Sequence, residues 1–172
     1  SLTELLVRLG HRQIGYVTLT ANHPHYSSVD RLAGCQSVLK TAGGSLEIFR
    51  PQKAGLDHGT LLTDLETWLQ RPDRPTALIG YGDDEALQLL MACYRLGLRT
   101  PEDISISAIR SSSTHLGGVM MTASEVRPGP MGHVAVEMLM TKIERPSRLL
   151  EPIVIPSRLH EGQTAGPVAP RS

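Results

Sequence analysis

Residues 76–106, TALIGYGDDEALQLLMACYRLGLRTPEDISI, constrain the fold more than any other part of the chain. The first six residues are a short apolar run, which is typical of a buried strand. Asp83 then opens a segment with the apolar spacing of a one-sided helix, and carboxylates suit that position because the first helical turn has unpaired N–H groups. Gly97 ends the helical pattern, and a second apolar run covers residues 104–109. Two strands joined by a helix through short loops make a β–α–β unit, which requires the strands to be parallel.

The same alternation of strand and helix patterns extends on both sides of this unit. A chain that alternates in this way layers its helices on a parallel sheet, so we expect an α/β fold with a doubly wound parallel sheet. In chain order, the other expected elements are helices at residues 2–9, 29–42, 60–69 and 131–144, and strands at 14–19, 46–49, 119–122 and 153–159.

The composition excludes several classes of partner. Seventeen Lys and Arg residues balance seventeen Asp and Glu residues, and no long block of one sign interrupts the mixture, so a nucleic-acid or anionic-membrane footprint is not expected. No apolar run has membrane-spanning length, and the first ten residues do not resemble a signal peptide. Cys35 and Cys93 both lie in helical patterns among apolar neighbours, which favours buried free thiols in a reducing compartment. We expect a cytoplasmic location.

Five short segments together carry a resemblance to a known family. They are LGHRQI at residues 9–14, RLAG at 31–34, PTA at 75–77 followed by DDEAL at 83–87, LGLR at 96–99 followed by PEDIS at 101–105, and MG at 131–132 followed by AVE at 135–137. These segments resemble, in order and spacing from residue 2 to residue 164, the effector-binding core of the lactose/galactose-repressor (LacI/GalR) family of bacterial transcription regulators. Each segment alone is a weak signal, and their combination is specific.

The resemblance implies a division of the chain. Members of this family begin with a helix-turn-helix headpiece and continue into a two-lobed core like a type I periplasmic binding protein, and the resemblance starts about midway along such a chain. It implies that residues 1–164 are a fragment of the effector-binding core and that residues 165–172 are a flexible tail. Within the fragment, 15–109 and 150–160 would form the C-terminal lobe, and 1–14 and 110–149 the remaining N-terminal-lobe elements and crossovers.

The function that the resemblance implies is effector sensing and dimerisation in a LacI-type transcriptional regulator. A small metabolite (a sugar, sugar phosphate or sugar acid) would bind in the cleft between the lobes, and operator DNA would be contacted only through a headpiece that is not expected in this chain. We expect a homodimer, no cofactor and no membrane contact. We also expect no enzymatic activity, because no nucleophile elbow, phosphate loop or dinucleotide fingerprint is present. The alternative is a solute-binding protein of an ABC transporter, which shares the fold.

Three candidate effector-binding residues follow from positions that match the family, and Tyr81 follows from its place near a cleft end; open α/β sheets bind ligands at the carboxyl ends of strands. Arg31 matches the arginine of "RLAG", whose planar charged fork suits hydroxyl pairs or carboxylates. Ser27 matches a position that often supplies a hydroxyl, although capping of the following helix explains it equally well. Asp83 matches the aspartate of an "Asn-Asp" pair, with Gly82 in place of the asparagine. Tyr81, like Tyr26, is placed to stack on a sugar ring.

The largest departure from the family pattern is Arg110. Family members have an aspartate there that accepts hydrogen bonds from sugar hydroxyls, whereas this chain reads SAIRS at residues 107–111. Our hypothesis is that Arg31 and Arg110 together hold an anionic effector, and the alternative is that Arg110 turns to solvent and the pocket has drifted or decayed.

No metal site is expected. The carboxylates at residues 83–85 could suggest Mg²⁺, but three successive carboxylates at a helix start cannot all face one ion, so capping is favoured. The seven histidines have no metal-ligand spacing that we would support, and His23 and His25 beside Tyr26 are interpreted as a polar loop pair.

Overall fold

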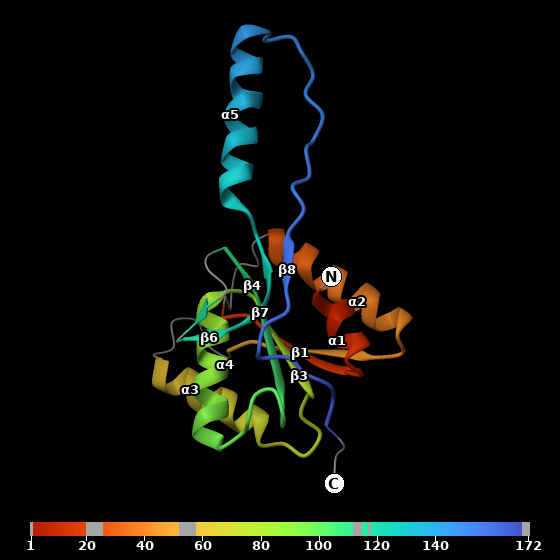
Figure 1. Cartoon of the computed structure of the whole chain (residues 1–172), viewed down its shortest axis with the longest axis vertical. Coiled ribbons are helices and arrows are strands. Elements are labelled where there is room, and N and C mark those ends of the chain that lie inside the picture. The colour runs from red at the N-terminus through yellow and green to blue at the C-terminus, as the bar shows by residue number, and fades with distance from the viewer. Residues whose placement is uncertain (1, 20–25, 52–57, 112–114, 117, 170–172) are drawn as a thin grey trace.

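The computed structural model describes residues 2–19, 26–51, 58–111, 115–116 and 118–169. Its centre is a six-stranded sheet in the order β2-β1-β3-β4-β7-β8, in which every neighbouring pair is parallel except β7 and β8. The expected α/β fold with a parallel sheet is therefore confirmed (Figure 1). The strands are β1 (Gln13–Val17), β2 (Ser45–Phe49), β3 (Ala77–Gly80), β4 (Ser105–Arg110), β7 (Thr122–Glu125) and β8 (Arg158–His160).

Helices cover both faces of the sheet, as a doubly wound fold requires (Figure 1). α1 (Leu2–Arg8) and α2 (Tyr26–Thr41) pack on one face, and α3 (His58–Leu69) and α4 (Asp83–Leu96) pack on the other. Each face has its own apolar core, because successive strand side chains point to opposite sides. The first core is built on Leu6, Ile14, Tyr16, Leu39 and Ile79, and the second on Val17, Leu65, Leu78, Leu89 and Ile106.

The central β–α–β unit forms as predicted. α4 begins at Asp83 and ends before Gly97, whose φ of 69° is left-handed, a conformation that glycine adopts without strain. The N–H of Leu98 donates to the carbonyl of Cys93 at 2.9 Å, which satisfies one of the last helical carbonyls. Cys93 and Cys35 are buried and free, as expected, and burial raises the pKa of Cys93 to about 12.

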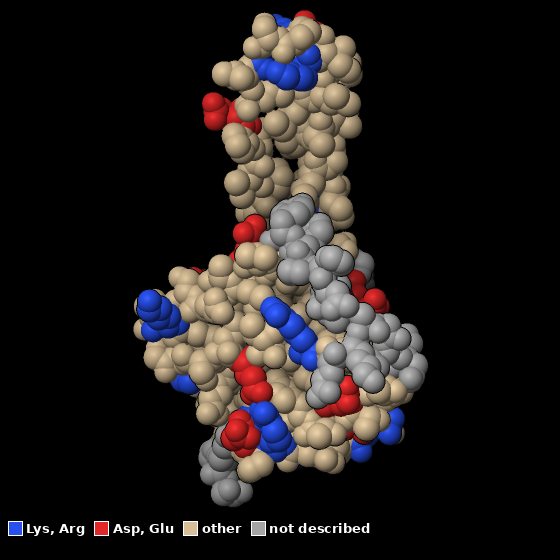
Figure 2. All heavy atoms as spheres, turned by 180° about the vertical axis from the view of Figure 1, so that it is seen from behind, with Lys and Arg blue, Asp and Glu red and all other residues tan. Residues whose placement is uncertain are grey.

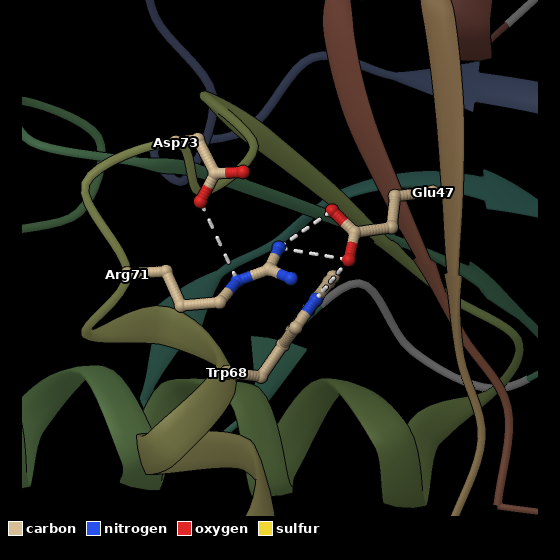
Figure 3. A network of polar contacts seen from close by, with 4 residues as sticks. All are labelled: Glu47, Trp68, Arg71 and Asp73. Atoms are coloured by element: carbon tan, nitrogen blue, oxygen red, sulfur yellow. Dashed lines mark hydrogen bonds and ion pairs between the residues drawn. The ribbon is translucent and has the colours of Figure 1, made fainter.

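A polar network attaches the edge strand β2 to the end of α3 (Figure 3). Glu47 accepts a hydrogen bond from the indole N–H of Trp68 at 2.7 Å and two from Nη2 of Arg71 at 2.8 and 2.7 Å. Nε of Arg71 lies 3.7 Å from Asp73. Charged hydrogen bonds of this kind hold an edge strand whose outer side has no strand neighbour among the described residues.

His11 organises the amino ends of the strands and the end of the chain. Its side chain is buried, Nδ1 lies 2.9 Å from Oγ1 of Thr76, and Nε2 lies 3.1 Å from Oγ of Ser105 and 3.0 Å from the carbonyl of Gly166. Burial lowers the pKa of His11, which keeps the ring neutral.

The central sheet together with α1–α4 is called the body below. The expected flexible tail at residues 165–172 packs on the body over its described residues, 165–169. The buried hydroxyl of Thr164 donates to the carbonyl of Ile106 at 2.6 Å, and the N–H of Val168 donates to the carbonyl of Leu9 at 3.0 Å. The polar composition of this segment suggested a tail. The segment is held in place because Thr164 and Gly166 form hydrogen bonds with Ile106 and Ser105 at the start of β4. Residues 170–172 lie outside the described part.

Three expected element boundaries are wrong. α2 begins at Tyr26, so Ser27 lies inside the helix instead of capping it. The expected strand at 119–122 is divided into β6 (Val119–Met120), which pairs with β5 (His115–Leu116), and β7 (Thr122–Glu125). The expected strand at 153–159 forms only at Arg158–His160, because β8 is the one part of that segment that reaches the sheet, where it pairs with β7.

Residues 128–157 form a projection that we call the arm (Figure 1). It consists of α5 (Pro128–Glu144), none of whose residues is buried, and an irregular return segment. Most apolar side chains of α5 are exposed, and Figure 2 shows that the shaft of the arm carries few charges between its root and its basic tip. Exposed apolar side chains of the arm are Met131, Val136, Leu139, Met140, Ile143, Leu149, Ile153 and Val154.

The elements expected outside the C-terminal lobe are placed in two different ways. α1 packs on α2, and β7 lies in the same sheet as β1, so both belong to the body. Only the arm stands apart from the body. No helix of the described residues has the length and apolar character needed to cross a membrane.

Candidate functional site

A pocket of about 240 Å³ lies where β3 and β4 end, and we call it the carboxyl-end pocket. The carboxyl ends of parallel strands meet at one edge of the sheet, which is why residues distant in sequence converge there. Of the five predicted site residues, Arg31, Tyr81, Asp83 and Arg110 line this pocket, and Ser27 bonds to one of them. The described residues that line it are Arg31, Tyr81, Gly82, Asp83, Ile109, Arg110, Ser111 and Val126.

Arg31, Tyr81 and Ser27 form one packed unit. Nη1 of Arg31 donates to the carbonyl oxygen of Tyr81 at 3.1 Å, and the guanidinium carbon lies 4.5 Å from the centre of the Tyr81 ring. The ring's negative face attracts the cation, so Tyr81 positions Arg31. The hydroxyls of Ser27 and Tyr81 lie 3.0 Å apart and hydrogen bond to each other. The hydroxyl of Ser27 thus contacts the wall of the pocket through Tyr81.

Arg110 and Asp83 form an ion pair that also lines the pocket. The side chain of Arg110 is 3% exposed, and its Nε donates to Oδ1 of Asp83, whose side chain is 35% exposed. The alternative in which Arg110 turns to solvent is therefore wrong. Asp83 is the first residue of α4, where the helix dipole also favours a negative charge.

The carboxylates at residues 83–85 face different groups. Asp83 contacts Arg110, whereas the buried carboxylate of Glu85 accepts a hydrogen bond from the N–H of Leu19 at 3.0 Å. This divergence does not favour the Mg²⁺ interpretation, and no cluster of three potential metal-ligating side chains occurs within the described residues. His23, His25 and the side chain of Tyr26 lie outside the described part of the chain.

Sequence reasoning missed Ile109, Ser111 and Val126 as pocket residues. Val126 follows β7, and its N–H donates to the carbonyl of Arg110 at 2.6 Å, so it continues the sheet at the pocket edge. The expected strand at 119–122 put this residue well beyond the strand end. The alternation of small residues in TASE at 122–125 was the only available signal for the true strand.

A second pocket of about 380 Å³ lies at the opposite, amino ends of the strands and is lined in part by His11, Thr76 and Asp103. Two of its polar side chains, His11 and Asp103, are already bonded within the protein. His11 has the three contacts given above, and Asp103 accepts hydrogen bonds from the side chain of Arg99 at 2.8 and 2.9 Å. These bonds hold the pKa of Asp103 well below its usual range. The smaller carboxyl-end pocket is the better candidate, because open α/β sheets bind ligands at the carboxyl ends of their strands.

Comparison with known proteins shows which proteins this chain resembles. Residues 3–165 match the model of the periplasmic binding protein-like domain. The ribose operon repressor of Haemophilus influenzae is 26% identical over 89% of this chain and 46% of its own length. The arabinose metabolism transcriptional repressor of Geobacillus stearothermophilus is 32% identical over 85% and 41%.

A crystal structure of a LacI transcriptional regulator from a Rhodococcus species superposes with a TM-score of 0.80 at 26% identity, covering 98% of this chain and 62% of that one. The chain spans a little under half the length of the curated relatives it matches.

Proposed function

Because the chain belongs to the family of periplasmic binding protein-like domains, which covers residues 3–165, we propose that it is the effector-sensing part of a LacI-type transcriptional regulator. The observation that supports this most is the carboxyl-end pocket, where Arg31, Tyr81, Asp83 and Arg110 converge from α2, β3, α4 and β4. A concave site with a few convergent polar groups at strand ends is the usual form of a small-metabolite site in open α/β sheets.

The ligand in this proposal is a small metabolite such as a sugar, sugar phosphate or sugar acid. Arg31, Asp83, Arg110 and Tyr81 would contact it directly, with Ser27 positioning Tyr81 through the hydroxyl contact. The chain would bind this effector without transforming it, as expected of a regulator. A solute-binding protein of a transporter would have the same fold, but the curated relatives are named as repressors.

The arm would belong to the second lobe of the core. Its exposed apolar side chains, among them Leu139 at 60% and Ile143 at 63%, are the kind of surface that folded proteins cover. We infer that further chain, in a protein as long as the relatives, covers α5 and faces the carboxyl-end pocket.

The proposed mechanism is a population shift between arrangements of body and arm. Arg110 of β4 lies opposite Glu125 of β7 in the strand register. The next residue, Val126, lines the pocket and leads directly into the arm. An effector that binds one arrangement more tightly than the other would shift the equilibrium by that difference in affinity. The operator headpiece, in the proposal, reads that shift in the cytoplasm.

The proposed homodimer is supported by an exposed apolar stripe on α4. Leu87, Met91 and Tyr94 are spaced by four and three residues, so they share one helix face, and they are 42%, 43% and 86% exposed. Apolar stripes of this kind are typical of surfaces that another protein covers.

A thermal-shift screen of the full natural protein against sugars, sugar phosphates and organic acids tests the proposal. A true effector raises the melting temperature in proportion to the logarithm of its concentration well above Kd. We expect that compound to change operator binding in a mobility-shift assay, and to remain chemically unchanged after incubation. Consumption of the compound, or stabilisation without any change in operator binding, would contradict the proposal.

A further inference from the structure

Two segments join the arm to the body among the described residues, and they lie side by side as the antiparallel strands β7 and β8 (Figure 1). β7 leads into α5 through Val126 and Arg127, and the return segment of the arm ends where β8 begins, at Arg158. A change in the orientation of the arm must be absorbed at the arm-side ends of these strands, because hinges are a few residues at the ends of elements. We call this place the root of the arm.

Side chains cross-link the two strands on both faces at the root. On one face, Nε2 of His160 lies 2.7 Å from Oε2 of Glu125. On the other face, the hydroxyl of Ser124 donates to the hydroxyl of Ser157 at 3.0 Å. The two contacts lie on opposite faces because Ser124 and Glu125 are consecutive residues of β7. Side chains therefore reinforce the backbone pairing of β7 with β8 where the arm begins.

The contact between His160 and Glu125 has the geometry of a charged pair. The two side chains are 27% and 32% exposed, so solvent screens the contact only in part. A separation of 2.7 Å is at the short end of the range for an N–H···O bond between charged groups. Protonation of the imidazole places a positive charge beside the carboxylate, and hydrogen bonds between ionised groups are about twice as strong as neutral ones. The contact therefore strengthens as the pH falls through the range in which histidine gains its proton.

The other charged groups around this pair are of kinds that keep their charge in that range. Arg110 of β4 and Arg158 of β8 both lie opposite Glu125 in the strand register, and arginine stays protonated in proteins. Glu161 follows His160 and forms an ion pair with α1. Among these side chains, histidine is the kind whose charge changes between pH 5 and pH 8. The arginines and carboxylates thus form a constant background, and His160 supplies the change.

We propose that His160 and Glu125 form a proton-dependent latch that controls the orientation of the arm. Protonation of His160 closes the latch and stabilises the arrangement of body and arm in this structure, and loss of the proton loosens the arm-side ends of β7 and β8. The latch acts on the effector site through Val126, which follows Glu125 and lines the carboxyl-end pocket. The inference rests on the proposed population shift between arrangements of body and arm, and it makes that equilibrium depend on pH.

Hydrogen–deuterium exchange of the full natural protein at pH 6 and pH 8 tests the latch. Wild type and His160→Gln are compared at each pH, so the pH dependence of intrinsic amide exchange cancels. We expect the amides of β7 and β8 to exchange about threefold faster in the variant at pH 6, and at nearly the wild-type rate at pH 8. Glu125→Gln is expected to give the same pattern. His133→Gln is the matched control, because it removes the histidine of an exposed histidine–glutamate pair on α5 and should leave both strands unchanged.

Single-molecule fluorescence energy transfer follows the orientation of the arm itself. The dyes are attached at Lys40 on the body and at Ser147 at the tip of the arm, both of which are exposed. We expect a narrower distribution of transfer efficiency at pH 6 than at pH 8 in the wild type. The distribution of His160→Gln is expected to match the wild-type distribution of pH 8 at both pH values.

Each contrary result overturns a defined part of the proposal. Equal acceleration of exchange at both pH values would overturn the proton dependence, and unchanged exchange at both would overturn the latch. A transfer distribution that does not change with pH, or that changes equally in His160→Gln, would overturn the control of the arm. These measurements use no effector, whereas the thermal-shift screen decides effector binding, so failure of the latch and failure of the proposed function are distinguishable.

Discussion

Replacing Asp83 by asparagine is expected to destabilise the protein more than removing the arginine with which it pairs. Asp83→Asn keeps the size of the side chain but removes the carboxylate charge that faces the Arg110 guanidinium, whose side chain is 3% exposed. Breaking a buried pair from one side lowers the free energy of unfolding by about 3–5 kcal/mol. Because the side chain of Asp83 is 35% exposed and solvent screens it, we expect a loss below that range, about 2–3 kcal/mol.

Arg110→Met is expected to lower the free energy of unfolding by only about 1 kcal/mol. It fills the buried volume with an apolar side chain and leaves Asp83 partly solvated at the start of α4, where the helix dipole favours its charge. Once Arg110 is replaced by methionine, adding Asp83→Asn changes the free energy of unfolding little. A double-mutant cycle therefore gives a coupling of about 2 kcal/mol.

Urea denaturation followed by the fluorescence of Trp68, the one tryptophan of the chain, measures these differences. Asp84→Asn is the matched control, since Asp84 is an exposed carboxylate at the same helix start, and we expect a change of no more than about 0.5 kcal/mol. Equal effects of Asp83→Asn and Arg110→Met, or simple additivity in the double variant, would refute the reasoning that Arg110 is buried against Asp83.

Three further measurements follow from other parts of the molecule. Gly97→Ala is expected to lower the free energy of unfolding by about 1 kcal/mol, measured by urea denaturation, because alanine at a φ of 69° is strained; an unchanged value would contradict the left-handed cap. Burial lowers the pKa of His11 below its ordinary value of about 6.5, so the unfolded chain binds the extra proton first, and stability is expected to fall as pH drops below that value. His11→Gln is expected to remove that part of the pH dependence, seen as a smaller loss of urea midpoint between pH 7 and pH 5. Met91→Glu is expected to convert the proposed dimer to monomers in sedimentation velocity with little change in melting temperature, since Met91 is 43% exposed; a persisting dimer would place the contact elsewhere.

Local patterns were sufficient to predict the centre of the fold. β3, α4 and β4 appear where the apolar periods and Gly97 place them, because each period matches the geometry of one element and needs no distant partner. Four of the candidate site residues were also identified from sequence. They lie at element ends, where a parallel sheet brings all carboxyl ends to one edge.

The elements that sequence reasoning misplaced are those defined by their neighbours. β7 has the weak pattern TASE and is a strand because it pairs with β4, and the error at its end concealed Val126 as a pocket residue. The C-terminal segment reads as a polar tail, yet Thr164 and Gly166 bond to the strand starts and to His11. Neither contact has a signal within its own stretch of sequence.

The sequence by itself determined the alternation of helices and strands, and with it the parallel sheet and the edge at which polar side chains gather. Only the tertiary structure decided that Arg110 faces Asp83 instead of solvent. The reason is the separation along the chain between the residues that interact. Backbone periodicity is set by residues three or four apart, whereas the partner of a charged side chain is set by which strand ends the fold brings together, here across twenty-seven residues.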